Sequence, residues 1–345
     1  MTPRIRYQAS AGPVVTFALV TMVPVYFREK TSRDLEEADK MGSYELIRKL
    51  GEGGMGEVWK ARHILLAHTT AIKLIKAEAL LRRAGDSNAE LAIRRFEREA
   101  RATAALKSVN TVDLYDFGTT DDGTCYYVME LLDGMDLGAL VKRFGPLPAH
   151  RAVHLLRQVC YSLIEAHERG MVHRDIKPAN VFVCRMKPHH DVIKVLDFGL
   201  VKHKRIKIDE TRLTSDGIVI GTPSYMAPEL AVGEDEIDGR ADLYSLGCVA
   251  YWLLTGVDVF EGDTPMKVIV SHVGEAPPRP SARSGIEIPR SLEDITLSCL
   301  EKNPNDRPQS ARELEDRLAD LELNETWNQR AAEQWWKIHL PEDEG

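Results

Sequence analysis

The sequence predicts an α+β protein in which a small β-rich region precedes a larger helical region. Between residue 44 and about residue 131, short runs rich in β-branched and aromatic residues are separated by Gly or Asp turns, which is typical of consecutive strands. From residue 137 onward, apolar residues recur at helical spacing. The stretch LLDGMD at 131–136 connects the two regions, and the chain shows no internal repeat or long low-complexity run.

The elements of each region follow from local patterns. Within the β-rich region a single helix is expected at 89–106, where apolar residues lie among charges at helical spacing. In the helical region, residues 241–256 are apolar almost all round, as in a buried core helix. The expected strands cover 44–50, 56–63, 69–76, 111–118 and 125–131, and the other expected helices cover 150–170, 291–303 and 310–323.

Composition limits the class of protein. The 345 residues are 43% hydrophobic and 28% charged, which is normal for a soluble globular protein. The net charge of −8 argues against a general nucleic-acid binder. No C-x-x-C pair occurs, so we expect reduced thiols rather than a disulfide framework or a zinc site. The cysteines are Cys125, Cys160, Cys184, Cys248 and Cys299.

The N-terminal arm, residues 1–43, contains an uncharged run at 11–27 between basic residues. A membrane-spanning helix needs about 20 apolar residues, and this shorter run carries two prolines, so a membrane anchor is not favoured. A disordered or surface-lying arm and a translation start at Met41 remain the alternatives. A secretory signal does not suit an ATP-using domain.

Glycines at 51–56, GEGGMG, fit the pattern G-x-G-x-x-G, which alone is a weak signal for a nucleotide site. A dinucleotide-binding loop requires a helix after the glycines, but the strand-like GEVWKARH follows here. No G-K-[ST] occurs, so a P-loop is excluded. The remaining arrangement is a glycine flap between two strands, whose backbone amides close over phosphates.

Charged residues further along the chain meet the demands of such a flap. Lys73 in AIK lies on the next expected strand. A lysine in a strand is usually solvated, so a functional role for Lys73 depends on the other motifs of the sequence. The following helix offers Glu99 as its partner, with Glu97 less suitable because the two point to different faces. The loop MVHRDIKPANVFV at 171–183 and the later DFG at 197–199 add further polar groups.

These segments, in this order, resemble the protein kinase family, and specifically the eukaryotic-like serine/threonine kinases of bacteria. The resemblance covers about residues 44–323. Lys177 after Asp175, and Thr222 in GTPSY, are similar to the serine/threonine class, since tyrosine kinases usually place alanine and arginine after the aspartate. The motifs are GEGGMGEVW, AIK, HRDIKPAN, DFG, GTPSYMAPE, DLYSLG and the late Arg307–Pro308.

The resemblance implies a bilobal protein-kinase fold, with a β-rich N-lobe at 44–132, a helical C-lobe at 133–325 and ATP in the cleft between them. Asp175 is expected to accept or orient the substrate hydroxyl proton, and Lys177 to steady the γ-phosphate. Lys73 is expected to pair with the α- and β-phosphates and to be oriented by Glu99.

The implied cofactors are ATP and Mg²⁺, with Mn²⁺ as an alternative metal. Asn180 and Asp197 are the expected metal ligands, because both offer hard oxygens. The expected nucleotide contacts are Leu50, Gly51, Glu52, Gly53, Gly54, Met55, Gly56, Val58, Ala71, Lys73, Met129, Glu130, Leu132, Asp136 and Phe182. Among them, Asp136 would bind ribose, although a helix N-cap is an equal alternative.

Other residues are given structural or regulatory roles by the resemblance. Glu229 and Arg307 are expected to form a buried ion pair, and Asp242 to brace the catalytic loop. Arg174 is expected to bind a phosphorylated activation loop. Autophosphorylation is expected at Thr214, then Thr211 or Ser215, against the alternative that these hydroxyls are merely solvated.

The two histidines of MKPHHD, residues 186–191, indicate a solvated turn rather than a metal site. The C-terminal extension, 326–345, carries Trp327, Trp335 and Trp336 at helical spacing and is interpreted as a helix that caps the helical lobe.

Three functions stay open: an active serine/threonine protein kinase, an ATP-binding scaffold with little catalysis, and a small-molecule kinase. Intact Lys73, Asp175 and Asp197 argue against the scaffold, and GTPSYMAPE, the expected peptide-binding shelf, argues against the small-molecule kinase. The expected partners are proteins with Ser or Thr, and a transient homodimer for autophosphorylation. The expected location is the cytoplasm, with membrane association as the alternative.

Overall fold

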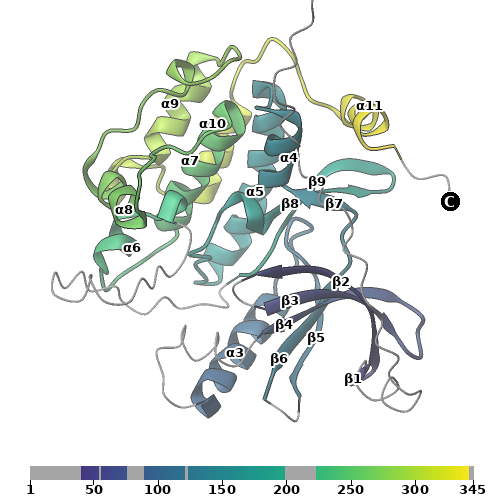
Figure 1. Cartoon of the computed structure of the whole chain (residues 1–345). Helices are drawn as coiled ribbons and strands as arrows, with labels where there is room; N and C mark the ends of the chain where they lie inside the picture. The colour runs from purple at the N-terminus through teal and green to yellow at the C-terminus, as the bar shows by residue number, and fades with distance from the viewer. Residues whose placement is uncertain (1–39, 54–55, 76–88, 121–122, 199–222, 342–345) are drawn as a thin grey trace, which may run out of the picture. The chain divides into compact units, whose positions relative to one another are not determined.

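The computed structural model describes residues 40–53, 56–75, 89–120, 123–198 and 223–341 (Figure 1). Met41–Gly345 forms one compact unit. The N-terminal run at 11–27 lies outside the described residues. Within the described ranges, no helix combines the length and the apolar character that crossing a membrane requires.

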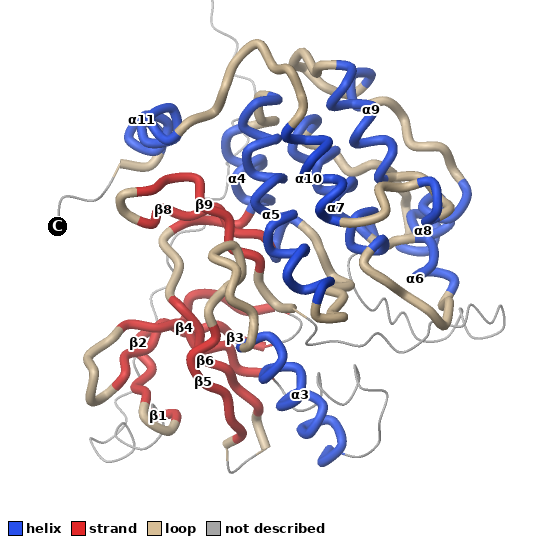
Figure 2. Tube along the Cα trace, turned by 180° about the vertical axis from the view of Figure 1, so that it is seen from behind, coloured by secondary structure: helices blue, strands red, loops and turns tan. Residues whose placement is uncertain are grey.

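In the described part of the small lobe, helix α3 (Ala89–Ala104) lies beside an antiparallel sheet (Figure 2). Phe96 on this helix is buried against Tyr127 of the sheet, with ring centroids 6.5 Å apart. The strand order is β1-β2-β3-β4-β6-β5. The strands are β1 (Lys40–Met41), β2 (Tyr44–Gly53), β3 (Gly56–His63), β4 (Thr69–Ile75), β5 (Leu114–Thr119) and β6 (Cys125–Glu130).

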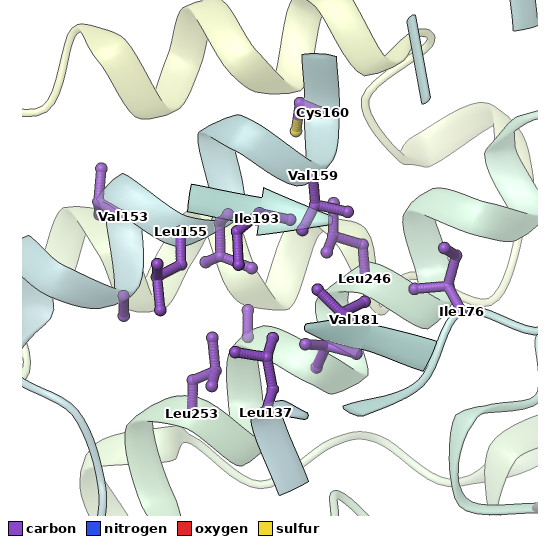
Figure 3. Close-up of a cluster of buried hydrophobic side chains, with 14 of the residues drawn as sticks. Leu137, Val153, Leu155, Val159, Cys160, Ile176, Val181, Ile193, Leu246 and Leu253 are labelled. Atoms are coloured by element: carbon purple, nitrogen blue, oxygen red, sulfur yellow. The ribbon is translucent and has the colours of Figure 1, made fainter. Parts of the chain in front are cut away.

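The large lobe is mainly helical, and its core gathers around α5 (Ala149–Glu168) and α7 (Arg240–Thr255). Figure 3 shows apolar side chains of these helices meeting those of a strand, among them Leu155, Leu246 and Val181. Nearly every residue of α7 is buried, as its all-round apolar sequence predicts. The other helices are α4 (Leu137–Phe144), α6 (Pro228–Val232), α8 (Pro265–Gly274), α9 (Arg290–Cys299), α10 (Ala311–Ala319) and α11 (Gln329–His339).

A second, three-stranded sheet lies where the two lobes join, in the order β7-β8-β9. It consists of β7 (Gly134–Asp136), β8 (Val181–Met186) and β9 (His189–Val195), all antiparallel. Short 3-10 turns occur at η1 (Pro178–Asn180), η2 (Pro223–Tyr225), η3 (Pro280–Ala282) and η4 (Pro304–Asp306).

The predicted elements are present, with shifted boundaries: β2 extends to Gly53, and helices α9 and α10 end at Cys299 and Ala319, four residues earlier than predicted. Strand β5 begins at Leu114 rather than at 111, because Val112 N–H donates to the carbonyl of Val195 at 3.0 Å and this segment therefore pairs with β9. Helix α3 ends at Ala104 rather than at 106. The kinase-like bilobal arrangement expected for the chain is confirmed.

One local prediction holds only in part: residues 187–188 form an exposed turn between β8 and β9. The segment 186–191 is not a solvated turn throughout, because its last residue, Asp191, is completely buried. Its carboxylate pairs with Arg151 and accepts hydrogen bonds from the indoles of Trp327 and Trp336. These partners lie far from Asp191 in the sequence, so no local sequence pattern predicts that Asp191 is buried. Trp327 itself lies before α11, not within it.

Candidate active site

The hairpin of β2 and β3 carries the glycines. Among the residues that the structure describes, a Cβ added at Gly51 or Gly53 would meet no atom within 4 Å, so no described contact requires glycine there. Gly56 differs, because its φ is +146° and a Cβ would lie 1.7 Å from the carbonyl oxygen of Leu74. Gly56 is therefore required by strand packing, whereas Gly51 and Gly53 leave the backbone open to a ligand.

The other predicted flap residues lie on the exposed edge of the hairpin. Leu50 is 40% exposed. Glu52 forms an ion pair with Lys49, whose ammonium also lies 2.9 Å from Glu57. Gly54 and Met55 lie outside the described residues.

Lys73, in β4, forms an ion pair with Asp197 of the DFG segment, and both side chains are largely buried, 13% and 16% exposed. Tyr127, opposite Lys73 in the register of β4 and β6, donates its hydroxyl to the other carboxylate oxygen of Asp197. Burial by itself would raise the pKa of Asp197, but the charge of Lys73 and the two hydrogen bonds outweigh it and hold the pKa below its ordinary value. Asp197 is therefore a carboxylate at neutral pH.

Helix α3 carries both glutamates considered as partners of Lys73. Glu97 is 39% exposed and pairs with Arg101 at 3.5 Å, along the outer face of the helix. Glu99 is half-buried. The hydroxyl of Thr103 lies 3.1 Å from the carbonyl oxygen of Phe198, which attaches α3 to the DFG segment. The described ion pair of Lys73 is with Asp197, so its pairing with Glu99 stays a prediction.

The loop that precedes β8 brings together three of the predicted residues. Lys177 Nζ lies 3.0 and 2.8 Å from the two carboxylate oxygens of Asp175. Asn180 Nδ2 donates to the carbonyl and the carboxylate of Asp175 at 2.8 and 3.0 Å. The backbone N–H of Leu196 donates to the carbonyl of Asn180 at 2.9 Å, which joins this loop to the DFG segment.

Asp242, at the start of α7, holds this loop in place. Its carboxylate is completely buried and accepts the backbone N–H groups of His173 and Arg174 at 2.8 and 2.7 Å. His167 Nε2 lies 2.8 Å from the same carboxylate. The expected bracing contact is therefore present. Arg174 has a φ of +64°, and its Nε is buried without a partner among the described residues.

The expected ion pair of the helical lobe is also present. Arg307 donates to both carboxylate oxygens of Glu229 at 2.7 and 2.8 Å. The two side chains are 0% and 5% exposed. Three backbone carbonyls accept the remaining donors of the guanidinium, at 2.7–3.0 Å.

Of the residues expected around adenine, those of the small lobe lie together, and Phe182 lies on another strand, β8. Val58, Ala71 and Met129 belong to one apolar cluster of the small lobe. Phe182 lies in β8, opposite Asp136 and Lys194 in register. The segment from Glu130 to Leu132 passes from one lobe to the other.

Two polar residues expected to contact the nucleotide, Glu130 and Asp136, have structural partners. Asp136 Oδ1 accepts the N–H of Ala139 at 2.8 Å, so it is the N-cap of α4, as one of its two interpretations predicts. The carboxylate of Glu130 lies 2.6 Å from Lys194, which is only 2% exposed. Sequence reasoning did not identify Lys194 or Tyr127; the one signal was that Lys194 interrupts an apolar strand.

The arrangement suits a divalent cation held with a phosphate ligand. Among the described residues there is no group of three His, Cys, Asp or Glu side chains placed to hold a metal ion. Mg²⁺ bound with nucleotide takes one or two carboxylates and several waters, so a smaller set suffices. The Asp197 carboxylate and the Asn180 amide oxygen supply hard donors of that kind. Thr211, Thr214, Ser215 and Thr222 lie outside the described residues.

Comparison with known proteins agrees with this geometry. The family model described as "Protein kinase domain" matches residues 44–318. The chain is 38% identical over 276 residues to the serine/threonine-protein kinase pkn3 of Myxococcus xanthus, covering 80% of this chain and 49% of that protein. It is 40% identical over 275 residues to the serine/threonine-protein kinase PknB of Mycobacterium leprae, covering 79% and 42%.

The chain therefore spans about half the length of these curated relatives or less. The crystal structure of the PknI kinase domain of Mycobacterium tuberculosis superposes with a TM-score of 0.60 at 29% identity, covering 81% of this chain and 96% of that one. The family match spans both lobes and every described residue of the site. The chain thus belongs to the protein kinase family, as one of its bacterial eukaryotic-like serine/threonine members.

Proposed function

We propose that this protein is an ATP-dependent serine/threonine protein kinase that transfers the γ-phosphate of ATP to protein hydroxyls. One observation carries the proposal: the contacts of Asp175, Lys177 and Asn180 on one loop, joined through Leu196 to the Lys73–Asp197 pair. The charge distribution suits phosphoryl transfer, in which the protein mainly positions reactants and neutralises charge.

Each residue has a role that its surroundings support. Asp175, held by Lys177 and Asn180, would accept or orient the proton of the substrate hydroxyl. Lys177 would also neutralise charge on the γ-phosphate, and Lys73 on the α- and β-phosphates. Membership of the family implies ATP and a divalent metal ion; we propose Mg²⁺, with Mn²⁺ as a substitute, held through Asp197 and Asn180.

The proposal extends to activation-loop phosphorylation. Arg174 has a buried Nε with no partner among the described residues, and a phosphate would supply an acceptor for it. The candidate sites are Thr214, then Thr211 or Ser215, modified in a transient homodimer. The need for ATP favours the cytoplasm, and membrane contact by residues 11–27 is not favoured.

Labelled ATP with Mg²⁺ tests the transfer reaction on the purified chain. The wild type should label itself and a generic protein substrate, and Asp175→Asn should lower the rate by at least about 100-fold. Lys142→Gln, an exposed change on α4, is the control and should keep the rate. Absence of transfer to any protein would overturn the proposal, and transfer to a small molecule alone would favour a small-molecule kinase.

The same reaction tests activation by phosphorylation. Mass spectrometry should find phosphate on the loop, and replacing Thr211, Thr214 and Ser215 together by Ala should reduce activity. Full activity of the triple variant would contradict this mode of activation.

A further inference from the structure

The C-terminal segment forms a built contact with the large lobe, centred on Asp191. Arg151 donates to both oxygens of this carboxylate at 2.8 and 3.0 Å. The indole of Trp327 donates to it at 2.8 Å and that of Trp336 at 2.6 Å. The guanidinium of Arg151 lies over the ring of Trp335, 3.8 Å from its centroid. These charged and polar groups fix the segment 327–340, which we call the C-terminal strap.

The strap also contacts the backbone of β9. The side-chain amide of Gln329, the first residue of α11, accepts the N–H of His190 at 2.9 Å and donates to its carbonyl at 3.2 Å. Figure 1 and Figure 2 both show α11 beside the β8–β9 hairpin. The family match ends at residue 318, so the strap is additional to the matched domain.

The same hairpin also holds the linker between the lobes, residues 131–134. Arg185, in β8, donates to both oxygens of Asp133 at 3.0 and 3.2 Å, and its backbone N–H donates to the carbonyl of Asp133 at 2.8 Å. Lys194, in β9, pairs with Glu130 just before the linker. Both hairpin strands therefore attach to the segment proposed to bind adenine.

Arg185 connects the strap and the linker directly. Its remaining terminal nitrogen donates to the carbonyl of Leu340 at 3.0 Å, and its guanidinium lies 5.3 Å from the ring centroid of Trp336. The Arg185 side chain is 14% exposed, while that of Asp133 is 63% exposed. With these contacts in place, the strap limits the positions that Arg185, and so Asp133, can take.

We infer that Arg185 is a positioning residue for the nucleotide, through which the C-terminal strap holds the interlobe linker in its ATP-binding geometry. The inference rests on the proposed function, because it assigns the linker to the adenine site. An ordered linker loses less conformational freedom when ATP binds, so loosening the strap weakens binding without touching the catalytic loop.

The test is binding of ATP with Mg²⁺ to the full chain, measured by titration calorimetry, for wild type, Arg185→Met and Trp336→Phe. Because the Asp133 end is exposed, Arg185→Met should raise the Kd about 2- to 5-fold, and Trp336→Phe should raise it less. In the kinetics KM for ATP should rise while kcat changes little. Arg157→Met is the matched control, since its half-buried arginine pairs with Glu315 on α10, and it should leave the Kd unchanged.

Amide hydrogen exchange gives a readout independent of nucleotide. Exchange of residues 131–134 should be faster in Arg185→Met and Trp336→Phe than in wild type or Arg157→Met. Equal Kd values and equal linker exchange in all four proteins would overturn the inference while leaving the proposed function standing. If the wild type bound no ATP at all, the proposed function would fail, and the inference with it.

If Arg185→Met does not fold, Asp133→Asn replaces it, because that change removes the charge at the exposed end of the contact. It should weaken ATP binding in the same direction, and an unchanged Kd would count against the inference.

Discussion

Two buried arginine–carboxylate pairs brace the large lobe, Arg307 with Glu229 and Arg151 with Asp191, and they differ in where their other hydrogen bonds originate. The guanidinium of Arg307 is completed by three backbone carbonyls near it. The carboxylate of Asp191 is completed by two indoles from the C-terminal strap. The first pair belongs to the matched domain, whereas the second depends on residues beyond it.

This difference indicates which pair is more sensitive to loss of its arginine. A buried charge that keeps other hydrogen bonds is less costly than one left alone. Removing Arg307 leaves the Glu229 carboxylate without its bidentate partner, while removing Arg151 leaves Asp191 with the bonds from Trp327 and Trp336. The pairs should therefore respond unequally to the same substitution.

The largest expected effect is that of Arg307→Met. It should lower the free energy of unfolding by about 3–5 kcal/mol, because an unpaired carboxylate stays buried. Arg151→Met should lower it by about 2–3 kcal/mol, since the indoles still bond Asp191. Urea unfolding of both variants measures the difference. An equal or larger loss for Arg151→Met would show that the indoles do not compensate.

An intermediate effect is expected from the strap itself. Trp336→Phe removes one hydrogen bond to a buried charged group and should lower the free energy of unfolding by about 1.5–3 kcal/mol. Trp327→Phe should cost less, because this side chain is only half-buried. Adding Asp191→Asn to each variant gives a double-mutant cycle. Independence of Trp336 and Asp191 in that cycle would argue against their hydrogen bond as a stabilising contact.

A last expected effect, confined to acidic pH, distinguishes the surroundings of the two pairs. In the Arg307 region, burial, with the charge of Lys302, lowers the pKa of His272 from 6.5 to about 4. The folded state thus resists protonation, so the contribution of His272 to stability is complete above pH 6.5 and is lost as pH falls toward 4. Between pH 7 and 5 the free energy of unfolding of the wild type should fall by about 2 kcal/mol more than that of His272→Gln.

Near Arg151, burial lowers the pKa of His154 too, but the carboxylate of Asp191 opposes it. His154→Gln should change the pH dependence in the same direction and by less. Thermal unfolding midpoints of the three proteins from pH 7 to 5 provide the measurement. Parallel curves for wild type and His272→Gln would contradict the assignment to His272.

Much of the kinase-like architecture could be predicted because its signals are local. The strand after the glycines at 51–56 and the absence of G-K-[ST] excluded two nucleotide folds, and the resemblance then assigned roles to Lys73, Asp175, Asn180 and Asp197. The start of α10 also agrees with the prediction, because Ser310, where the predicted helix begins, is its N-cap. In each case the residues that carry the information are neighbours in the chain.

Tertiary structure alone decided the remaining contacts. Tyr127 meets Asp197 because the strand register places it opposite Lys73. Asp191 is buried because Trp327 and Trp336, which follow it by 136 and 145 positions, donate to its carboxylate. The neighbours of Asp191 in the sequence predict a solvated turn, and so an exposed carboxylate. A carboxylate can be buried without a large free-energy cost only when it accepts hydrogen bonds, and here the donors are distant in the sequence. A pattern of neighbouring residues carries no information about such donors.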